Sequence, residues 1–293
     1  VTHRQEHLRS ASVNAQVRLK HPHAHWDRRR CLTVVTQRDL DEHAPETRIV
    51  VAINPQTDRI AKRHRHSPTR HQVTKEDQLR FLAEVDGAAL VAHPDVDLIS
   101  FTGSTRAGRL IAAAAANGPK PLILELGGNS PVVVFNDVDI AGAVANLSDT
   151  ALYNAGQECM SAARMLIHES VVDEFVSALR DKFSQIVMGD PFDPSTTLGP
   201  LVSRRHHTAV RSWIDNLPDH ADIAFGGGSP EGPGFFVEPT VIVGVQQTDG
   251  IVQEEVFGPV TTIQTFRDDA QALTLANDVR QGLAASVWTR DVG

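Results

Sequence analysis

The chain has 293 residues, of which 41% are hydrophobic and 22% charged, and its formal net charge is -8. This balance is typical of a globular protein of about two domains, and it excludes collagen-like, fibrous and disulfide-stapled classes. Two cysteines favour a reducing, cytoplasmic setting. No apolar run approaches the roughly 18 residues of a membrane span, and the first 20 residues lack the apolar centre of a signal peptide.

The charge is divided unevenly along the chain. Residues 1–71 hold 14 Lys/Arg, 7 Asp/Glu and nine of the 14 histidines, whereas residues 72–293 hold 14 Lys/Arg and 29 Asp/Glu. Segments 21–30 and 62–68 show neither helical nor strand periodicity, and only the apolar runs 32–35 and 49–53 have the character of short strands. We therefore expect residues 1–73 to form an atypical basic segment with poor order.

Three interpretations of this basic segment compete. Its Lys/Arg clusters could bind nucleic acid, although interleaved aromatics and a known module are lacking. Its histidines, spaced two apart, could bind a metal, although no acidic or cysteine partner stands at ligand spacing. We favour the third interpretation, a segment without an evolved function, because Arg-, His- and Pro-rich sequence of this kind is also what an out-of-frame reading produces.

From about residue 74 onwards, strands and helices alternate. In chain order, the pattern predicts an amphipathic segment at 76–92, a strand at 98–101, a helix at 106–117, strands at 121–125 and 131–135, a helix at 138–153, a strand at 165–168, a helix at 169–187, strands at 236–243 and 260–266, a helix at 268–280 and a strand at 284–288. This alternation predicts an α/β fold with a mainly parallel sheet.

The first candidate site lies where the strand at 98–101 leads through Gly103 and Ser104 into a helix. Such a turn exposes backbone N–H groups at the positive end of the helix dipole, where a phosphate binds well. The Gly-x-Gly-x-x-Gly spacing is absent, so an ordinary turn capped by Ser104 or Thr105 is the alternative.

Two residues with catalytic chemistry stand at the ends of predicted elements. Glu125 ends a strand before Gly127 and Gly128, where partial burial would raise the pKa of a carboxyl group and suit it to general-base work. Cys159 follows a helix and a flexible glycine, and nearby N–H groups or cations would lower its pKa and make it a nucleophile. The alternatives are a surface glutamate and a buried packing cysteine.

Residues 253–260 combine a carboxylate, an aromatic ring and a Gly-Pro turn. Glu255 could hold a ribose hydroxyl and Phe257 a flat ring, and the alternative is a plain connection from a helix end to a strand. The three glycines at 226–228 could cradle a phosphate, but the Ser-Pro pair and the glycines after them indicate a hairpin loop. We predict no site there.

Four motifs occur in a fixed order: Phe-Thr-Gly-Ser-Thr at 101–105, Glu-Leu-Gly-Gly-Asn-Ser-Pro at 125–131, Gly-Gln-Glu-Cys at 156–159 with Arg164 behind it, and Glu-Val-Phe-Gly-Pro-Val at 255–260. In this order and spacing, the chain resembles the NAD(P)-dependent aldehyde dehydrogenase superfamily from about residue 87 to its last residue. The resemblance implies an aldehyde-dehydrogenase-like α/β fold with mainly parallel sheets, in which residues 74–126 form a partial Rossmann-type cofactor domain and residues 127–293 an α/β catalytic domain.

The resemblance also implies roles for single residues. Cys159 matches the family's nucleophile, which forms a thiohemiacetal and then a thioester, and its backbone N–H is half of the oxyanion site. Glu125 matches the general base that activates the hydrolytic water. Gly103 and Ser104 match the pyrophosphate-binding turn, Glu255 the residue that holds the nicotinamide ribose, and Phe257 a residue packed beside the cofactor. The implied cofactor is NAD or NADP, the partner is a small-molecule aldehyde, and no metal, nucleic acid or membrane is expected.

Departures from the family pattern limit these implications. The family's second oxyanion donor, an asparagine in a Pro-Trp-Asn stretch, and its lysine strand are absent, and the strand used for oligomerisation does not follow the strand at 284–288. Losing one oxyanion donor costs about 100- to 1000-fold in rate. We therefore expect a catalytic domain truncated at its C-terminus. The alternatives to an aldehyde-oxidising enzyme are an inactive remnant, a nucleic-acid binder that uses residues 1–71, and an esterase or acyl transferase that uses Cys159.

Overall fold

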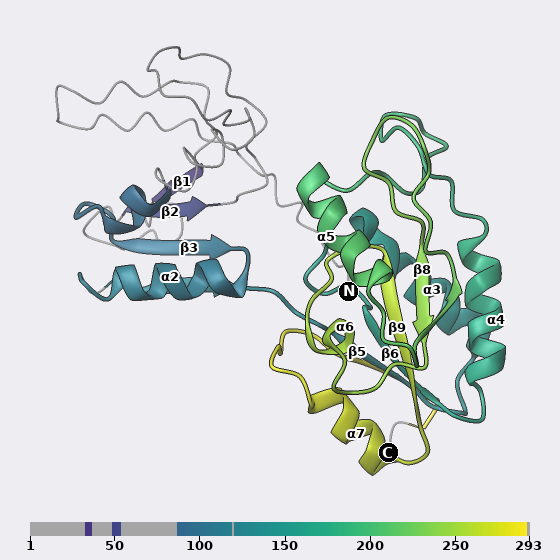
Figure 1. Cartoon of the computed structure of the whole chain (residues 1–293). Coiled ribbons are helices and arrows are strands. Elements are labelled where there is room, and N and C mark those ends of the chain that lie inside the picture. Colours follow the sequence, from purple (N-terminus) through teal and green to yellow (C-terminus); the bar gives the residue numbers. More distant parts are fainter. Residues whose placement is uncertain (1–32, 37–48, 54–86, 119, 292–293) are drawn as a thin grey trace, which may run out of the picture. The chain divides into compact units, whose positions relative to one another are not determined.

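The structure is a computed structural model that describes residues 33–36, 49–53, 87–118 and 120–291 (Figure 1). It divides into two compact units, Val1–Leu126 and Gly127–Gly293. The basic segments 21–30 and 62–68 lie outside the described residues, as does most of the amphipathic segment 76–92, of which residues 87–92 are helical. Each unit is described by itself below.

The first unit contains a four-stranded sheet, with helix α2 (Thr105–Ala115) running alongside β3 (Leu98–Thr102) (Figure 1). The strand order is β1-β2-β3-β4, with bounds β1 Thr33–Thr36, β2 Ile49–Ile53, β3 Leu98–Thr102 and β4 Leu122–Glu125. Strands β2, β3 and β4 are parallel, and β1 is antiparallel to β2. The short strands predicted from the apolar runs 32–35 and 49–53 are thus present.

The helix of the first unit, α2 (Thr105–Ala115), begins where its sequence predicts. The Ser104 hydroxyl accepts a hydrogen bond of 3.2 Å from the Ala107 N–H, which satisfies one of the unpaired donors of the first turn. Apolar side chains of residues 90–96, β3, α2 and β4 form a small core; its buried members are Val91, Val96, Ile99, Phe101 and Ala115.

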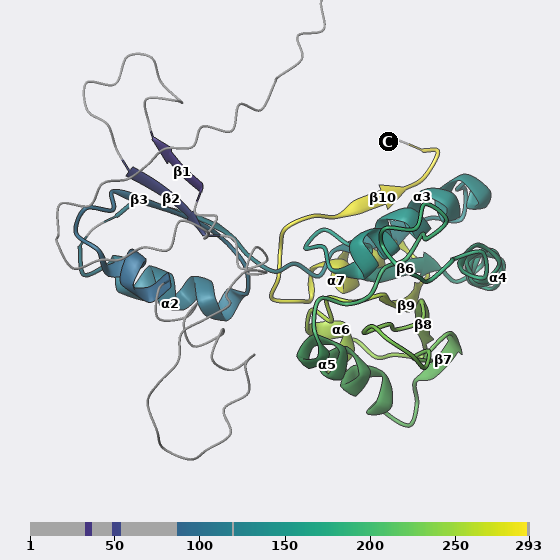
Figure 2. The same ribbon diagram turned by 90° about the horizontal axis from the view of Figure 1, so that it is seen from above.

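The second unit is built on a six-stranded sheet in the order β10-β5-β6-β9-β8-β7, and Figure 2 shows the strands running from β10 at the top of this unit to β7 at its lower edge. The bounds are β5 Pro131–Val134, β6 Arg164–His168, β7 Asp222–Phe225, β8 Thr240–Val243, β9 Val260–Phe266 and β10 Ser286–Trp288. All neighbours pair in parallel except β7 with β8. The expected mainly parallel sheet is therefore confirmed.

Both faces of this sheet are covered, as the continuous apolar runs of its strands require. The helices are α3 Ile140–Leu152, α4 Val172–Phe183, α5 Arg204–Asp215, α6 Gly250–Gln253 and α7 Asp269–Asn277. Val132 and Val134 of β5 face the larger core, to which α3, α4 and α5 contribute, whereas Val133 packs in a smaller core with Ala272 of α7. The alternation along β5 follows from the period of two in a strand.

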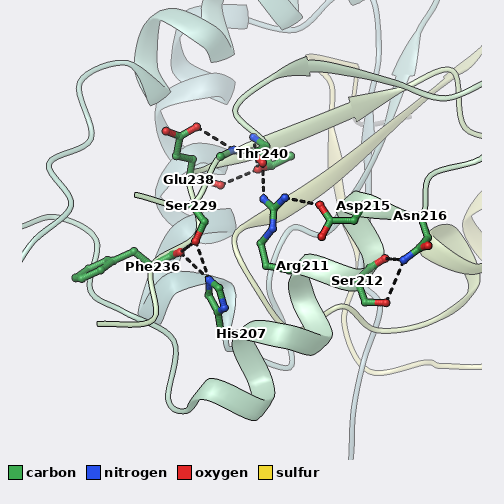
Figure 3. Close-up of polar contacts among 11 residues, drawn as sticks. His207, Arg211, Ser212, Asp215, Asn216, Ser229, Phe236, Glu238 and Thr240 are labelled. Carbon is green, nitrogen blue, oxygen red and sulfur yellow. Dashed lines mark hydrogen bonds and ion pairs between the residues drawn. The ribbon is translucent and has the colours of Figure 1, made fainter. Parts of the chain in front are cut away.

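The glycine run at 226–228 lies in the hairpin loop between β7 and β8, as predicted. Gly226 and Gly227 adopt φ values of 81° and 84°, which favour glycine. Polar contacts tie α5 to this loop (Figure 3): Arg211 donates to the Gly227 carbonyl, and His207 Nε2 lies 2.8 Å from Ser229 Oγ. The loop's polar groups are used within the hairpin and with α5.

The sequence pattern missed three elements of the second unit: α5, α6 and β7. Helix α5 is the most informative of them, because its Val210 and Ile214 are buried while its other positions are mainly polar. Ser203 caps it by accepting a 3.2 Å hydrogen bond from the His206 N–H. The signal was present as a serine followed by apolar residues at 210, 213, 214 and 217, one face of a helix.

Candidate functional site

Cys159 lies on the segment that joins α3 to β6. Its thiol is free and partly buried, and the Glu158 carbonyl accepts a 3.1 Å hydrogen bond from the Ser161 N–H, so Cys159 and Met160 form the centre of a β-turn. Met160 is exposed. The thiol therefore sits on a tight turn directly before a central, buried strand.

The approach to this turn is conformationally unusual. Asn154, Ala155 and Gly156 have φ values of 50°, 57° and 70°, a run of left-handed residues that costs free energy for the two that carry a side chain. Reciprocal bonds hold it: Asn154 Nδ2 donates to the Gln157 carbonyl at 3.1 Å, and Gln157 Nε2 donates to the Asn154 carbonyl at 2.9 Å. Gln157 Oε1 also accepts from the Val202 N–H at 2.9 Å. The loop before Cys159 is thus fixed by a buried amide.

The surroundings of the thiol favour its protonated form. Burial raises the pKa of Cys159, and so do the Glu158 carboxylate, which accepts a 3.2 Å hydrogen bond from Sγ, and the charge of Glu255; the residue's own N–H acts in the opposite direction. We expected N–H groups or cations to lower this pKa. That expectation is wrong for the structure described, because the charges that act on the sulfur are carboxylates.

Gly127 and Gly128 make room for two distant segments. A Cβ atom on Gly128 would lie 2.3 Å from the carbonyl oxygen of Cys159, and one on Gly127 would lie 2.1 Å from Glu255 Oε2. The Gly128 N–H donates to Glu255 Oε1 at 3.1 Å. Burial raises the pKa of Glu255, and this hydrogen bond partly offsets the effect. The glycine pair therefore brings the thiol segment and a half-buried carboxyl group to the same place.

Arg164 holds the backbone next to the glycine pair. It is 1% exposed, and its guanidinium donates to three backbone carbonyls: Asn129 at 3.1 Å, and Leu275 and Ala276 in the last turn of α7 at 3.2 and 3.0 Å. Burial lowers its pKa to about 10, and the charge of Asp278 acts against that shift. Asn129 in turn donates to the Val252 carbonyl at 2.7 Å. The network fixes the backbone that follows Gly128.

Phe257 is held in a left-handed conformation, with φ of 56°. His206 Nε2 lies 2.6 Å from the Phe257 carbonyl oxygen, and because a carbonyl only accepts, the imidazole donates its N–H here. The two rings also meet edge to face, with centroids 5.9 Å apart. His206 on α5, which the sequence analysis did not single out, thus positions a residue that it did.

The first unit carries the other predicted residues. The Gly103 N–H donates to the Glu125 carbonyl at 2.9 Å, so the ends of β3 and β4 lie together. Ser104 caps α2 through its hydroxyl. The Glu125 side chain is exposed. Gly103, Ser104 and Glu125 therefore meet at the carboxyl ends of parallel strands, the edge at which open α/β sheets bind ligands.

The predicted residues fall into two groups. Cys159, Glu255 and Phe257 belong to the second unit, and Gly103, Ser104 and Glu125 to the first. Their catalytic and cofactor-binding roles stay predictions. Among residues 87–118 and 120–291, no three His, Cys, Asp or Glu side chains are grouped as a metal ion would require. Within the described part of the chain, no helix combines the length and apolar character needed to cross a membrane.

Comparison with known proteins places the chain in a family. The profile of the aldehyde dehydrogenase family matches residues 83–293. The chain belongs to the aldehyde dehydrogenase family, as the four motifs indicated.

Relatives give the comparison more detail. A chloroplastic betaine aldehyde dehydrogenase of Beta vulgaris and a hydroxyisobutyraldehyde dehydrogenase of Mycolicibacterium austroafricanum are each 41% identical over 209 residues, which cover 70% of this chain and 42% of either relative. The chain thus spans less than half the length of these relatives.

Solved structures of aldehyde dehydrogenases are also similar to this chain. A mutant aldehyde dehydrogenase from Bacillus cereus matches with a TM-score of 0.69 and 36% identity, over 71% of this chain and 42% of its own. A double mutant of Staphylococcus aureus betaine aldehyde dehydrogenase in complex with NAD+ matches with a TM-score of 0.68 and 36% identity, over 74% and 48%. The aldehyde-dehydrogenase-like α/β fold is confirmed.

Proposed function

We propose that this chain carries the nucleophile and part of the cofactor site of an enzyme that oxidises an aldehyde to a carboxylic acid with NAD or NADP. The observation that carries the proposal is the junction at Gly128, which touches the Cys159 carbonyl on one side and binds the Glu255 carboxylate on the other. The backbone that carries the proposed nucleophile and a carboxylate suited to hydroxyl groups meet at this glycine.

The residues of the second unit suit a nicotinamide nucleotide. The Gly128 N–H uses one of the roughly four lone-pair positions of the Glu255 carboxylate, which leaves acceptors for the two hydroxyls of a ribose. The left-handed Phe257, fixed by His206, offers a ring beside them. In the first unit, the N-terminus of α2 with Ser104 at its cap suits a pyrophosphate. A bound NAD(P) supplies the acceptor for the hydride.

Cys159 performs the covalent step in this proposal. Its sulfur adds to the aldehyde carbon as the thiol proton leaves, which gives a thiohemiacetal, and loss of hydride from that carbon leaves a thioester. The backbone N–H of Cys159 donates to the oxygen anion of the adduct. Because burial and the neighbouring carboxylates raise the pKa of the thiol, loss of its proton is a cost that the reaction must meet.

Glu125 completes the cycle. We assign its carboxylate the role of general base, which takes a proton from water as that water attacks the thioester. Hydrolysis releases the carboxylic acid and restores the thiol. Its exposure leaves it accessible to water.

The remaining assignments follow the same proposal. Residues 74–126 belong to the cofactor domain and residues 127–293 to the catalytic domain, with residues 1–73 an atypical basic segment. The relatives named for betaine aldehyde and hydroxyisobutyraldehyde suggest small polar aldehydes as substrates, and the complex of the Staphylococcus aureus relative favours NAD. The cytoplasmic location expected from cysteine usage stays a prediction.

The test is an assay of the full chain with NAD or NADP and a panel of small aldehydes, read by the absorbance of the reduced cofactor. We expect reduced cofactor to form with the wild-type chain and with Cys31→Ser, and not with Cys159→Ser. Equal activity of the wild-type chain and Cys159→Ser, with both shown to be folded by circular dichroism, would refute the proposal.

A further inference from the structure

The residue before the thiol, Glu158, makes a direct contact that the proposed mechanism does not use. Glu158 Oε1 lies 3.2 Å from Cys159 Sγ and accepts its hydrogen bond. Both side chains are partly buried, and the β-turn from Glu158 to Ser161 fixes their backbones. The Glu158 carboxylate is therefore held beside the thiol by the fold of the turn.

Glu255 contributes a second negative charge that acts on the Cys159 sulfur. It acts on Cys159 through space, while its own carboxylate is anchored to the Gly128 N–H. Glu158 and Glu255 are thus two negative charges that raise the pKa of the thiol. An electrophile that reaches the sulfur therefore enters a negative field.

We propose that Glu158 makes Cys159 selective for neutral and cationic electrophiles and against anionic ones, so that the substrate class of this site is a neutral or positively charged aldehyde. The inference rests on the proposed function for the role of Cys159 as the nucleophile. It goes beyond that function by naming a residue that determines the charge of the substrate.

Electrostatic repulsion explains this selectivity and sets its expected size. To bring its reactive carbon to Sγ, a small anionic substrate must place its charge within several ångströms of the Glu158 carboxylate. Two like charges about 7 Å apart at an effective dielectric constant of about 40 repel by roughly 1.2 kcal/mol, or about sevenfold in rate. A cation gains by the same interaction, and a neutral aldehyde is unaffected.

The test uses two alkylating reagents that differ in charge. In both reactions the thiolate forms a bond to the reagent's methylene carbon, iodide leaves, and the thiol proton passes to solvent. Iodoacetamide is neutral and iodoacetate is anionic. The ratio of their rates on one thiol at one pH is independent of the fraction of thiolate, so a change in the pKa of Cys159 does not affect it.

We expect the iodoacetamide-to-iodoacetate ratio at Cys159 to be about three- to tenfold larger in the folded chain than in the chain unfolded in urea. Glu158→Gln should lower the ratio towards the unfolded value. Glu158→Asp, which keeps the charge, should retain most of the difference, as should Glu231→Gln, which removes a charge from an exposed position in the β7–β8 loop. Peptide mapping by mass spectrometry separates Cys159 from Cys31.

Two results would overturn the inference: an equal ratio in the folded and unfolded wild-type chain, or an equal ratio in wild type and a Glu158→Gln variant that unfolds at the wild-type temperature. Neither result would touch the proposed function, because alkylation needs no cofactor and no turnover. Conversely, normal charge selection in a chain that forms no reduced cofactor would refute the proposed function alone.

Discussion

The chain contains two glycine runs, at 127–128 and 226–228, that have similar partners and different consequences. In each, a glycine N–H donates to a glutamate carboxylate: Gly128 to Glu255 at 3.1 Å and Gly228 to Glu238 at 3.0 Å. In each, an arginine binds a backbone carbonyl, because Arg164 donates to Asn129 beside the first run and Arg211 to Gly227 within the second.

The difference lies in what the glycines are needed for. Gly226 and Gly227 adopt positive φ, and their partners belong to the hairpin itself or to the adjacent α5. Gly127 and Gly128 do not adopt positive φ; they are crowded by Glu255 and by Cys159, which lie far away in the sequence. A glycine run therefore closes a local turn in one case and joins distant chemical groups in the other. Matched substitutions in the two regions should separate stability from function.

The largest difference is expected for the arginines. Arg164→Met removes the donor to one buried and two partly buried carbonyls, and we expect it to lower the free energy of unfolding by about 3–5 kcal/mol. Arg211→Met, at a partly exposed position, should cost about 1 kcal/mol. Urea unfolding measures both values. Similar losses for the two variants would show that the buried network around the first run is no more important than the hairpin contacts.

Alanine in place of one glycine in each run tests the site itself. Gly128→Ala must displace the backbone of Cys159, so we expect aldehyde oxidation to fall by about 100-fold. In Gly228→Ala the new methyl meets the flexible end of Glu238, and the activity per folded molecule should stay at the wild-type level. The reduced-cofactor assay, normalised to folded protein, measures both; a Gly128→Ala variant with wild-type activity would contradict the importance of this contact.

The adjacent histidines on α5 allow a third pair of matched substitutions. His206 holds the Phe257 carbonyl, whereas His207 contacts Ser229 and the Phe236 carbonyl of the hairpin. We expect His206→Ala to weaken NAD binding by about tenfold, which corresponds to the loss of one hydrogen bond between neutral groups. His206→Gln should recover part of the affinity, because its amide can donate to the same carbonyl. His207→Ala is the control, with affinity unchanged. Titration calorimetry would decide, and equal affinities for His206→Ala and wild type would rule out the positioning role.

The smallest effect concerns the glutamates. Because burial raises the pKa of Glu255, its contribution to stability is fully present below the ordinary value of 4.5 and is lost as the pH rises through the raised value of the folded state. Glu255→Gln keeps an acceptor for the Gly128 N–H without the charge, so at neutral pH it should unfold at a slightly higher temperature than wild type, and this gain should vanish below pH 4.5.

The same substitution should weaken NAD binding, whereas Glu238→Gln should not. Thermal melts at two pH values and a titration with NAD measure both properties. A lower melting temperature for Glu255→Gln at neutral pH would contradict the prediction that the Glu255 charge destabilises the folded state.

Periodicity predicted most of the fold because most of its strands and helices are strongly apolar on one face. Strand β9 begins and ends as predicted, whereas α5 was missed because few of its residues are buried. The motifs named Cys159, Glu255 and Phe257 as candidates, and the roles of these residues stay predictions. The motifs also contain Glu158 but did not predict its hydrogen bond with the thiol, which depends on the folded turn, and they could not point to His206, which acts through a carbonyl 51 residues away. The raised pKa of Cys159 was likewise hidden, since it depends on burial and on Glu255.

In the proposed function, Cys159 forms a thioester with the substrate and Glu125 promotes the hydrolysis of that thioester. The most direct measurement is mass spectrometry of the Cys159 peptide after the Glu125→Gln chain is mixed with NAD and an aldehyde and quenched in acid. We predict a stoichiometric acyl adduct on Cys159 in this variant and little in wild type. Formation of reduced cofactor with no adduct on Cys159 in either protein would contradict the claim.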